Sequence, residues 1–126
     1  MENEDNFSYR QEKIKTIVIE ELNIEVETYV HDKGKKLLDI KIPEGWRLLT
    51  IQELIFLHNN KKYRDQLNME NTWEFIEQPL EFNKEKGQVV GFYSSPFGAT
   101  FYCNRSPIDP IPSMGIRLCR DLNKNN

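Results

Sequence analysis

Apolar and polar residues alternate along two short stretches near the start of the chain. Ile17 and Ile19 occupy every second position in the first stretch, and Ile24 and Val26 do so in the second. A period of two is typical of β-strands with one buried face. The pattern therefore predicts two strands, joined by a tight link or bulge at residues 20–23.

The segment that follows is divided by turn residues. A turn is expected around Gly34, and residues 37–42 predict a short strand or extended segment that ends at a proline. Pro43–Gly45 then predicts another turn. Trp46 leaves this turn extended and is expected to pack into the core, while Arg47 is expected to bind a carbonyl or carboxylate near the terminal strand.

A helix start follows at once. Thr50 and Glu53 have the spacing of a capping box, in which two side chains satisfy free backbone amides at the first helical turn. The apolar periodicity after them predicts a helix from Thr50 to Asn59. A second short helix is expected over residues 61–67.

The remaining chain returns to strand-like patterns. Trp73 and Phe75 lie on one face of a predicted strand that ends at Pro79, with Glu74 and Ile76 on the other face. Three more strands are expected over residues 88–95, 98–104 and 114–121, separated by turn and proline-rich segments. Strands, then helices, then strands indicate an α+β fold with a mostly antiparallel sheet.

Length and charge narrow the class of protein. With 126 residues, 15.0 kDa and 38% hydrophobic residues, the chain predicts one domain over residues 13–126 after a flexible, acidic segment at 1–12. A net charge of -3 argues against nucleic acid as the main partner. No apolar run approaches the roughly 20 residues of a membrane span, and the acidic, polar start of the sequence does not resemble a signal peptide. We therefore expect no membrane association and a soluble, cytoplasmic protein.

Three motifs resemble those of a known family. The stretch "GWRLLTIQEL", from Gly45 to Leu54, resembles the Gly-Trp-Arg-Leu-Pro-Thr-x-x-Glu-Leu signature of bacterial unknown-function domains with a C-type-lectin-like fold. "GFYSS" and "GIRLCR" match the later strands of that family, with Leu49 and Tyr93 as departures from its proline and tryptophan. The resemblance, which extends distantly to formylglycine-generating enzymes, implies a C-type-lectin-like fold with one main helix and a short second helix.

The resemblance also suggests activities to test against the residues. Calcium-dependent sugar binding in C-type lectins needs a Trp-Asn-Asp strand, which this sequence lacks. Formylglycine-generating enzymes hold copper with a close pair of cysteines. Cys103 and Cys119 are the only cysteines, and we expect buried free thiols, with a disulfide and a Cu(I) pair as the alternatives.

Other candidate chemistry is sparse. His31 and His58 have no carboxylate or serine partner at motif spacing, although the fold can assemble a triad that spacing does not reveal. The six glycines are scattered singly, so no phosphate-binding loop is expected. We predict no catalytic residue, no metal and no cofactor.

The most promising binding region is the pair of loops around the last strands. These loops combine prolines, small hydroxyl residues, an aromatic ring and an arginine, as rigid binding loops often do. The predicted binding residues are Ser94, Ser95, Phe97, Asn104, Arg105 and Asp109.

The sequence thus favours a non-catalytic accessory module that recognises a protein or another macromolecule through its C-terminal loops. One alternative is an oxidase of the formylglycine-generating type that uses Cys103 and Cys119. The other is a structural subunit that assembles through Trp73, Phe75 and Tyr93 on an exposed sheet face. The oligomeric state and the identity of the partner stay open.

Overall fold

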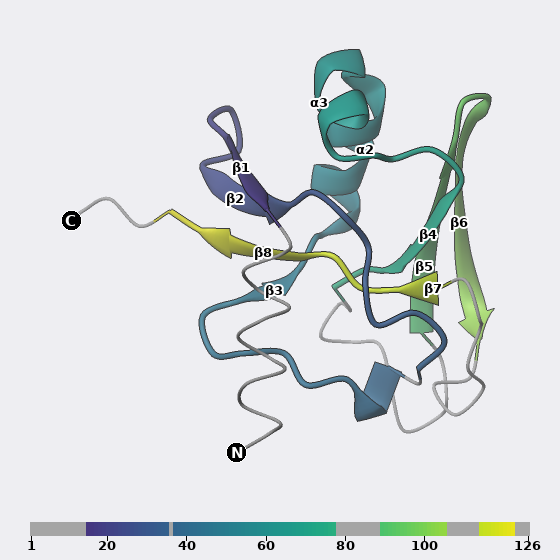
Figure 1. Cartoon of the computed structure of the whole chain (residues 1–126). Helices are drawn as coiled ribbons and strands as arrows, with labels where there is room; N and C mark the ends of the chain where they lie inside the picture. The colour runs from purple at the N-terminus through teal and green to yellow at the C-terminus, as the bar shows by residue number, and fades with distance from the viewer. Residues whose placement is uncertain (1–14, 36, 78–88, 106–113, 123–126) are drawn as a thin grey trace.

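The computed structural model describes residues 15–35, 37–77, 89–105 and 114–122. In this part of the chain, two α-helices lie between two mostly antiparallel β-sheets (Figure 1). The predicted α+β class is therefore confirmed, with two sheets where one was expected. No helix among the described residues is long and apolar enough to cross a membrane.

The first sheet joins the two ends of the described chain. Its order is β1-β2-β8-β3, with every neighbour antiparallel; the strands are Thr16–Ile19, Ile24–Glu27, Leu118–Asp121 and Arg47–Leu48 in that order. Ile19, Ile24 and Val26 are buried, which confirms the alternation seen in the sequence. Asn23, with φ of 56°, makes the tight link between the first two strands.

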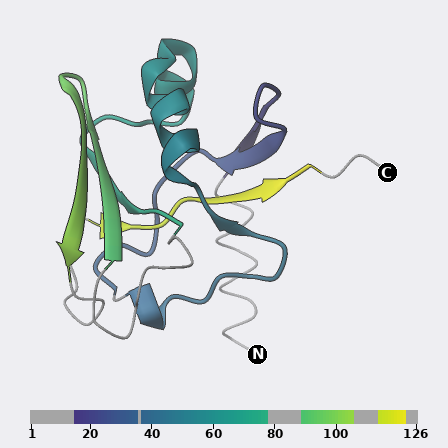
Figure 2. The ribbon, with the colours of Figure 1, turned by 180° about the vertical axis from the view of Figure 1, so that it is seen from behind.

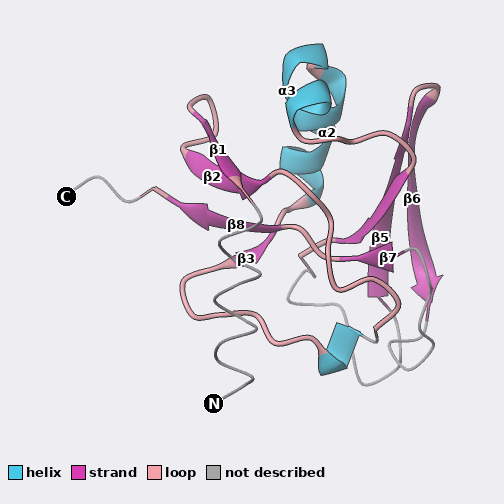
Figure 3. Ribbon diagram, viewed as in Figure 1, coloured by secondary structure: helices cyan, strands magenta, loops and turns pink. Residues whose placement is uncertain are grey.

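The second sheet has the order β6-β5-β4-β7 (Figure 3). Only the β4–β7 pair is parallel. The strands are Gly98–Arg105, Val89–Ser95, Thr72–Phe75 and Met114–Gly115 in that order. The single strand predicted for residues 114–121 is wrong, because the chain there leaves the second sheet after β7 and enters the first at β8.

The helical segment begins as the sequence predicts. Helix α2, Ile51–Asn59, starts after Thr50, whose hydroxyl accepts from the Glu53 amide while the Glu53 carboxylate accepts from the Thr50 amide. Both halves of the capping box are present. Asn60 caps the next helix, α3, Lys61–Gln66, through the Lys62 amide.

Arg47 fixes the start of α2 to the end of β8. Its guanidinium donates to both carboxylate oxygens of Glu53, at 2.9 Å each, and to Asp121 at 2.9 Å. These hydrogen bonds raise the pKa of Arg47 and lower the pKa of Asp121. The predicted role of Arg47 at the terminal strand is confirmed, and Trp46 packs against a core cluster as expected.

One predicted element differs. The extended segment expected at residues 37–42 instead begins with a short 3-10 helix, η1, Leu37–Asp39, in which the Ile40 amide donates to the Leu37 carbonyl. Leu37 is buried and packs with Met114 and Ile116 in a second core cluster. The turn of η1 is enough to bury Leu37, and no described strand pairs with residues 37–42. The segment therefore does not form a strand.

The two core clusters lie on opposite faces of β4. Ile76 belongs to the larger cluster between the sheets and helices, whereas Phe75 belongs to the smaller one with Leu48 and Leu118. The last two residues of β4, Glu74 and Phe75, are buried, whereas Thr72 and Trp73 are half-buried. Glu74, which the sequence pattern places on the face opposite Trp73 and Phe75, is fully buried.

Candidate functional site

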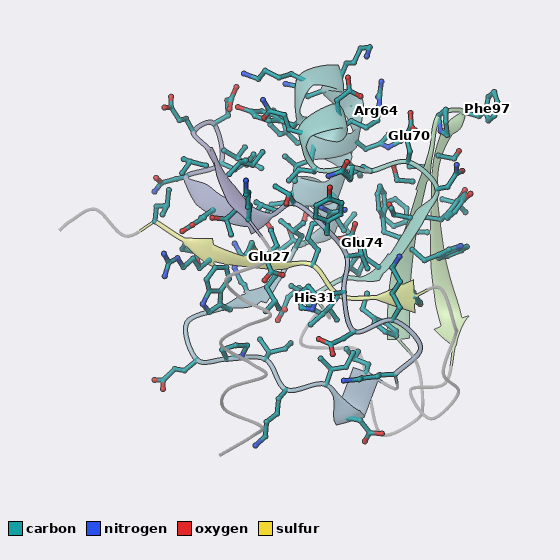
Figure 4. The ribbon with its side chains drawn as sticks, viewed as in Figure 1. Glu27, His31, Arg64, Glu70, Glu74 and Phe97 are labelled. Carbon is teal, nitrogen blue, oxygen red and sulfur yellow. The ribbon has the colours of Figure 1, made fainter. Side chains whose placement is uncertain are left out.

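The hairpin of β5 and β6 ends in a tight turn that presents one aromatic ring to solvent. Phe97 has 98% of its surface exposed, the largest exposure among the apolar side chains of the described chain. Figure 4 shows its ring pointing away from the body of the protein. Pro96 precedes it in the turn, where its restricted φ limits the conformations available to the loop.

The hydroxyl of Ser95 holds the backbone of this turn. Ser95 Oγ accepts a hydrogen bond from the Phe97 amide and donates to the Gly98 carbonyl, both at 3.2 Å. Gly98 has φ of 149°, a conformation that side chains disfavour. Glycine at position 98 permits the φ that the turn requires, while the ring of Pro96 and the hydrogen bonds of Ser95 limit the conformations of the backbone that carries Phe97.

The neighbouring serine anchors the hairpin to the core. Ser94 is fully buried; its hydroxyl donates to the Met69 carbonyl and accepts from His58 Nδ1, at 2.7 Å each. Because the Ser94 proton is given to a carbonyl, His58 does not act as a base toward it. Burial, and then the charge of Arg64, lower the pKa of His58. This contact is structural rather than a nucleophile–base pair.

The predicted binding residues do not gather in one place. Ser94, Ser95 and Phe97 lie at the turn of the hairpin, whereas Asn104 and Arg105 lie at the far end of β6, where Arg105 pairs with Val89 (Figure 1). An eight-residue strand spans roughly 23 Å, so the two groups of residues occupy opposite ends of the hairpin. Asp109 lies outside the described residues.

The sheet face proposed for self-assembly is only partly open. The rings of Trp73 and Tyr93 pack against each other with centroids 4.7 Å apart, and the Tyr93 hydroxyl donates to Asn71. Phe75, however, is buried in the smaller core cluster. The expectation that all three aromatic residues line an exposed face is therefore wrong for Phe75.

The cysteines do not form a pair. Cys119 is a free, buried thiol on β8, and burial raises its pKa to about 12. Cys103 lies on β6 in the other sheet. The disulfide alternative is thus excluded for Cys119, and its protonated thiol is a poor metal ligand. Among the described residues, no group of three or more His, Cys, Asp or Glu side chains is placed to hold a metal ion.

His31 has two acidic partners that sequence spacing did not reveal. Its Nε2 lies 2.6 Å from Glu27 Oε1 and its Nδ1 lies 2.9 Å from Asp32 Oδ2. Burial lowers the pKa of His31, but the hydrogen bonds and charges of Glu27 and Asp32 outweigh it, so the pKa is raised. With a carboxylate at each ring nitrogen, the charged form of His31 is favoured, and both of its nitrogens are engaged in contacts within the protein.

A buried ion pair lies between the two sheets. Arg117, on the segment that passes from β7 to β8, places Nε 3.2 Å from both carboxylate oxygens of Glu74. Its Nη1 donates to the Glu27 and Leu67 carbonyls, and Glu27 in turn accepts from the Leu118 amide. We refer to Glu27, His31, Glu74 and Arg117 as the crossover cluster; its carboxylates and imidazole are labelled in Figure 4.

The crossover cluster was missed by sequence reasoning. The alternation of residues 73–76 assigned Glu74 to one face of its strand but did not say whether that face is buried, and a charged residue can be buried when a partner is present. The one available signal was the pair of oppositely charged residues, Glu74 and Arg117, each flanked by apolar residues.

Comparison of the chain with protein-family models, with curated proteins and with solved structures finds no match.

Proposed function

We propose that the protein is a non-catalytic binding module and that it recognises a partner protein by inserting Phe97 into an apolar pocket of that partner. The observation that carries this proposal is the near-complete exposure of a phenylalanine on a turn whose backbone is fixed by hydrogen bonds. Leaving such a ring in water forgoes roughly 1.5–3 kcal/mol of burial free energy. A binding surface is a physical reason for a chain to carry that cost.

Contacts between the end of β5 and the core hold the hairpin tip in place, and a rigid tip binds more tightly. Ser94 fixes the last residues of β5 to the core through Met69 and His58. A ring that is held in place before contact loses less conformational freedom on binding, which raises affinity for a given contact area. Aromatic side chains at the centre of an interface are also the ones that most often dominate its free energy.

A protein is favoured over nucleic acid as the partner. Nucleic-acid sites that use aromatic rings combine them with a basic surface. The residues of the tip, from Ser94 to Thr100, carry no charge, and the chain as a whole has a net charge of -3. An uncharged turn with one apolar ring matches an apolar pocket better than a phosphate backbone.

For the fold we retain the C-type-lectin-like architecture as a proposal. Three observations support it: the pairing of β2 with the C-terminal strand β8, a main helix directly after the Gly-Trp-Arg stretch, and a second sheet formed by the later strands. Such scaffolds carry specificity in their loops. Membership in the bacterial family with the Gly-Trp-Arg-Leu-Pro-Thr signature is proposed on the same grounds.

A site-specific photocrosslinking experiment tests the proposed role of the tip. A photoreactive phenylalanine analogue replaces Phe97 in one protein and Tyr29, which is 56% exposed in a different loop, in the control. Both proteins are irradiated in an extract of the source cells. We expect one protein to crosslink to position 97 and not to position 29.

The captured protein is then purified and its affinity measured. Replacement of a central aromatic residue typically costs at least about 2 kcal/mol, or roughly 30-fold in Kd. Phe97→Ala should therefore weaken binding by at least that factor, while Tyr29→Ala leaves Kd unchanged. Equal crosslinking at both positions, or an unchanged Kd for Phe97→Ala, would refute the role of the tip.

A further inference from the structure

Strand β6 forms an outer edge of the second sheet and differs from every other described edge strand. The edge strands β3 and β7 have two residues each, and β1 has four, with Lys15 and Glu20 at its ends. β6 has eight residues, and residues 98–104 contain neither a charge nor a proline. Short length, charge, proline and β-bulges are the usual protections against pairing with another chain. The register of β6 against β5 shifts between Tyr102 and Arg105, but residues 98–102 are regularly paired and have none of these protections.

The turn determines which backbone groups of β6 face outward. Ser95 pairs with Gly98 across a two-residue loop, and a loop of that length requires this first pair to exchange hydrogen bonds directly. Because the pattern alternates, Thr100 bonds to β5, whereas Ala99 and Phe101 direct their N–H and C=O groups away from it. No described residue pairs with this outer side. The outward N–H and C=O groups of β6 can therefore form hydrogen bonds with one more extended strand.

We propose that this strand is β6 of a second copy of the chain, paired antiparallel about a two-fold axis at Phe101. Antiparallel pairing is symmetric, so a single edge supplies both halves of the interface. With Phe101 opposite Phe101 of the second copy, Ala99 lies opposite position 103, just beyond Tyr102, where the regular pairing of β6 with β5 ends. The outward backbone groups of Ala99 and Phe101 then face the backbone of the second copy. The uncharged stretch brings no like charges together.

The exposed ring of Phe101 supports this register. Phe101 packs on Phe92, with ring centroids 5.2 Å apart, but remains 39% exposed. Residues directly opposite in a strand pair lie on the same face, about 5.5 Å apart at Cα when hydrogen-bonded. The two Phe101 rings therefore meet on one face and cover apolar surface that a single copy leaves open.

The dimer leaves the hairpin tips free. In an antiparallel β6 pair the two Phe97 turns point to opposite ends of one continuous sheet, so neither turn lies in the interface. The proposed self-association goes beyond the proposed function and does not depend on it.

Sedimentation equilibrium with two variants at one position tests the pairing. Ala99→Pro removes an outward N–H, which edge strands tolerate, and leaves the bonds from Thr100 to β5 in place. Ala99→Val retains that N–H and suits a strand. We expect a concentration-dependent dimer for the wild type and Ala99→Val, and dimerisation at least about tenfold weaker for Ala99→Pro, since a symmetric interface is altered twice.

Thermal melting confirms that each variant is folded before its association is compared. Phe97→Ala separates the edge from the tip, and it should dimerise as the wild type does. A wild-type protein that stays monomeric at several hundred micromolar overturns the proposal, as does a dimer equally strong in Ala99→Pro and Ala99→Val. Loss of the dimer in Phe97→Ala would also overturn the proposal, because the contact between the two copies would then involve the hairpin tip. Photocrosslinking at position 97 tests the proposed function separately, and its outcome does not depend on whether the protein dimerises.

Discussion

The crossover cluster and the hairpin tip each hold side chains in surroundings that are unfavourable for them: buried charges in the cluster and an exposed apolar ring at the tip. In the crossover cluster, Glu74 and Arg117 are both fully buried, away from the water that would solvate their charges. At the tip, Phe97 is exposed to the water that it would otherwise avoid. Figure 2 shows, from behind, how far apart these regions lie: the segment between β7 and β8 runs through the centre, and the hairpin turn stands at the outer end of the second sheet.

The crossover cluster and the hairpin tip differ in whether contacts within the chain offset the free-energy cost of placing the side chains there. Most of the cost of burying the charges of the crossover cluster is offset within the chain, by an ion pair and by carbonyl and amide contacts. Only one guanidinium nitrogen, Arg117 Nη2, is buried without a hydrogen-bond partner among the described residues. The exposed ring has no such compensation inside the chain. The cluster therefore belongs to the framework, whereas the exposure of Phe97 is the cost that the proposed partner would offset.

The largest expected effect is the loss of one partner from the buried ion pair. Arg117→Met leaves the Glu74 carboxylate buried without its cation, and breaking such a pair typically destabilises a protein by about 3–5 kcal/mol. Burial already raises the pKa of Glu74, against the opposing effect of Arg117. Chemical denaturation of Arg117→Met should show this loss in the free energy of unfolding.

The matched control replaces both charges. Arg117→Met combined with Glu74→Leu removes the buried charge altogether, and well-packed apolar replacements of buried pairs are often neutral. We expect the double variant to be more stable than the single variant. A double variant no more stable than the single one would mean that the ion pair is not what makes this segment sensitive.

A second expected effect comes from the close approach of two backbone segments beside β7. A Cβ built on Gly115 would lie 2.2 Å from the His31 carbonyl oxygen, which belongs to a backbone paired with Ile116. Gly115→Ala should therefore cost about 1–3 kcal/mol, as overpacking of a close contact does. Gly91→Ala is the control, because its nearest neighbour is the flexible end of Met114, and it should cost less in the same denaturation experiment.

The two histidines should give opposite pH dependence. The pKa of His31 is raised in the folded protein, so its contribution to stability is full below about pH 6.5, the ordinary value, and is lost as pH rises through the folded pKa. The pKa of His58 is lowered, so its contribution is present above about 6.5 and is lost as pH falls.

Unfolding measured from pH 5 to 9 in His31→Gln and His58→Gln separates the two contributions. The stability advantage of the wild type over His31→Gln should shrink as pH rises, and its advantage over His58→Gln should shrink as pH falls. Advantages that change in the same direction would contradict the contacts of one of the two histidines.

The smallest expected effect on stability is at the tip. Phe97→Ala removes a side chain that is 98% exposed, and such surface changes usually stay within about 0.5 kcal/mol. The free energy of unfolding should be unchanged in chemical denaturation. A loss well beyond that value would place Phe97 in the framework and remove the contrast with the crossover cluster.

Local patterns in the sequence predicted the parts of the fold that depend on neighbouring residues. The alternation around Ile17 and Ile24, the capping box at Thr50, and the attachment of Arg47 to the terminal strand are all confirmed. Each depends on spacing along the chain or on a charged residue placed beside a helix start. Phe97 was also named as a binding residue from the turn chemistry around it.

Contacts between distant segments could not be read in the same way. Glu74 and Arg117 are 43 positions apart, and nothing in either local pattern distinguishes a buried charge with a partner from an exposed one. The separation of Phe97 from Arg105 likewise follows from the length and pairing of β6, which bring neighbouring loops in the sequence to opposite ends of a hairpin.

Recognition of a partner by the exposed ring is tested by the affinity of Phe97→Ala for the protein captured at position 97. Measured on a variant whose stability matches the wild type, Kd should rise by at least about 30-fold, as expected for a central aromatic residue. A Kd equal to that of the wild type would show that the exposed ring is not the recognition element, and would contradict the account.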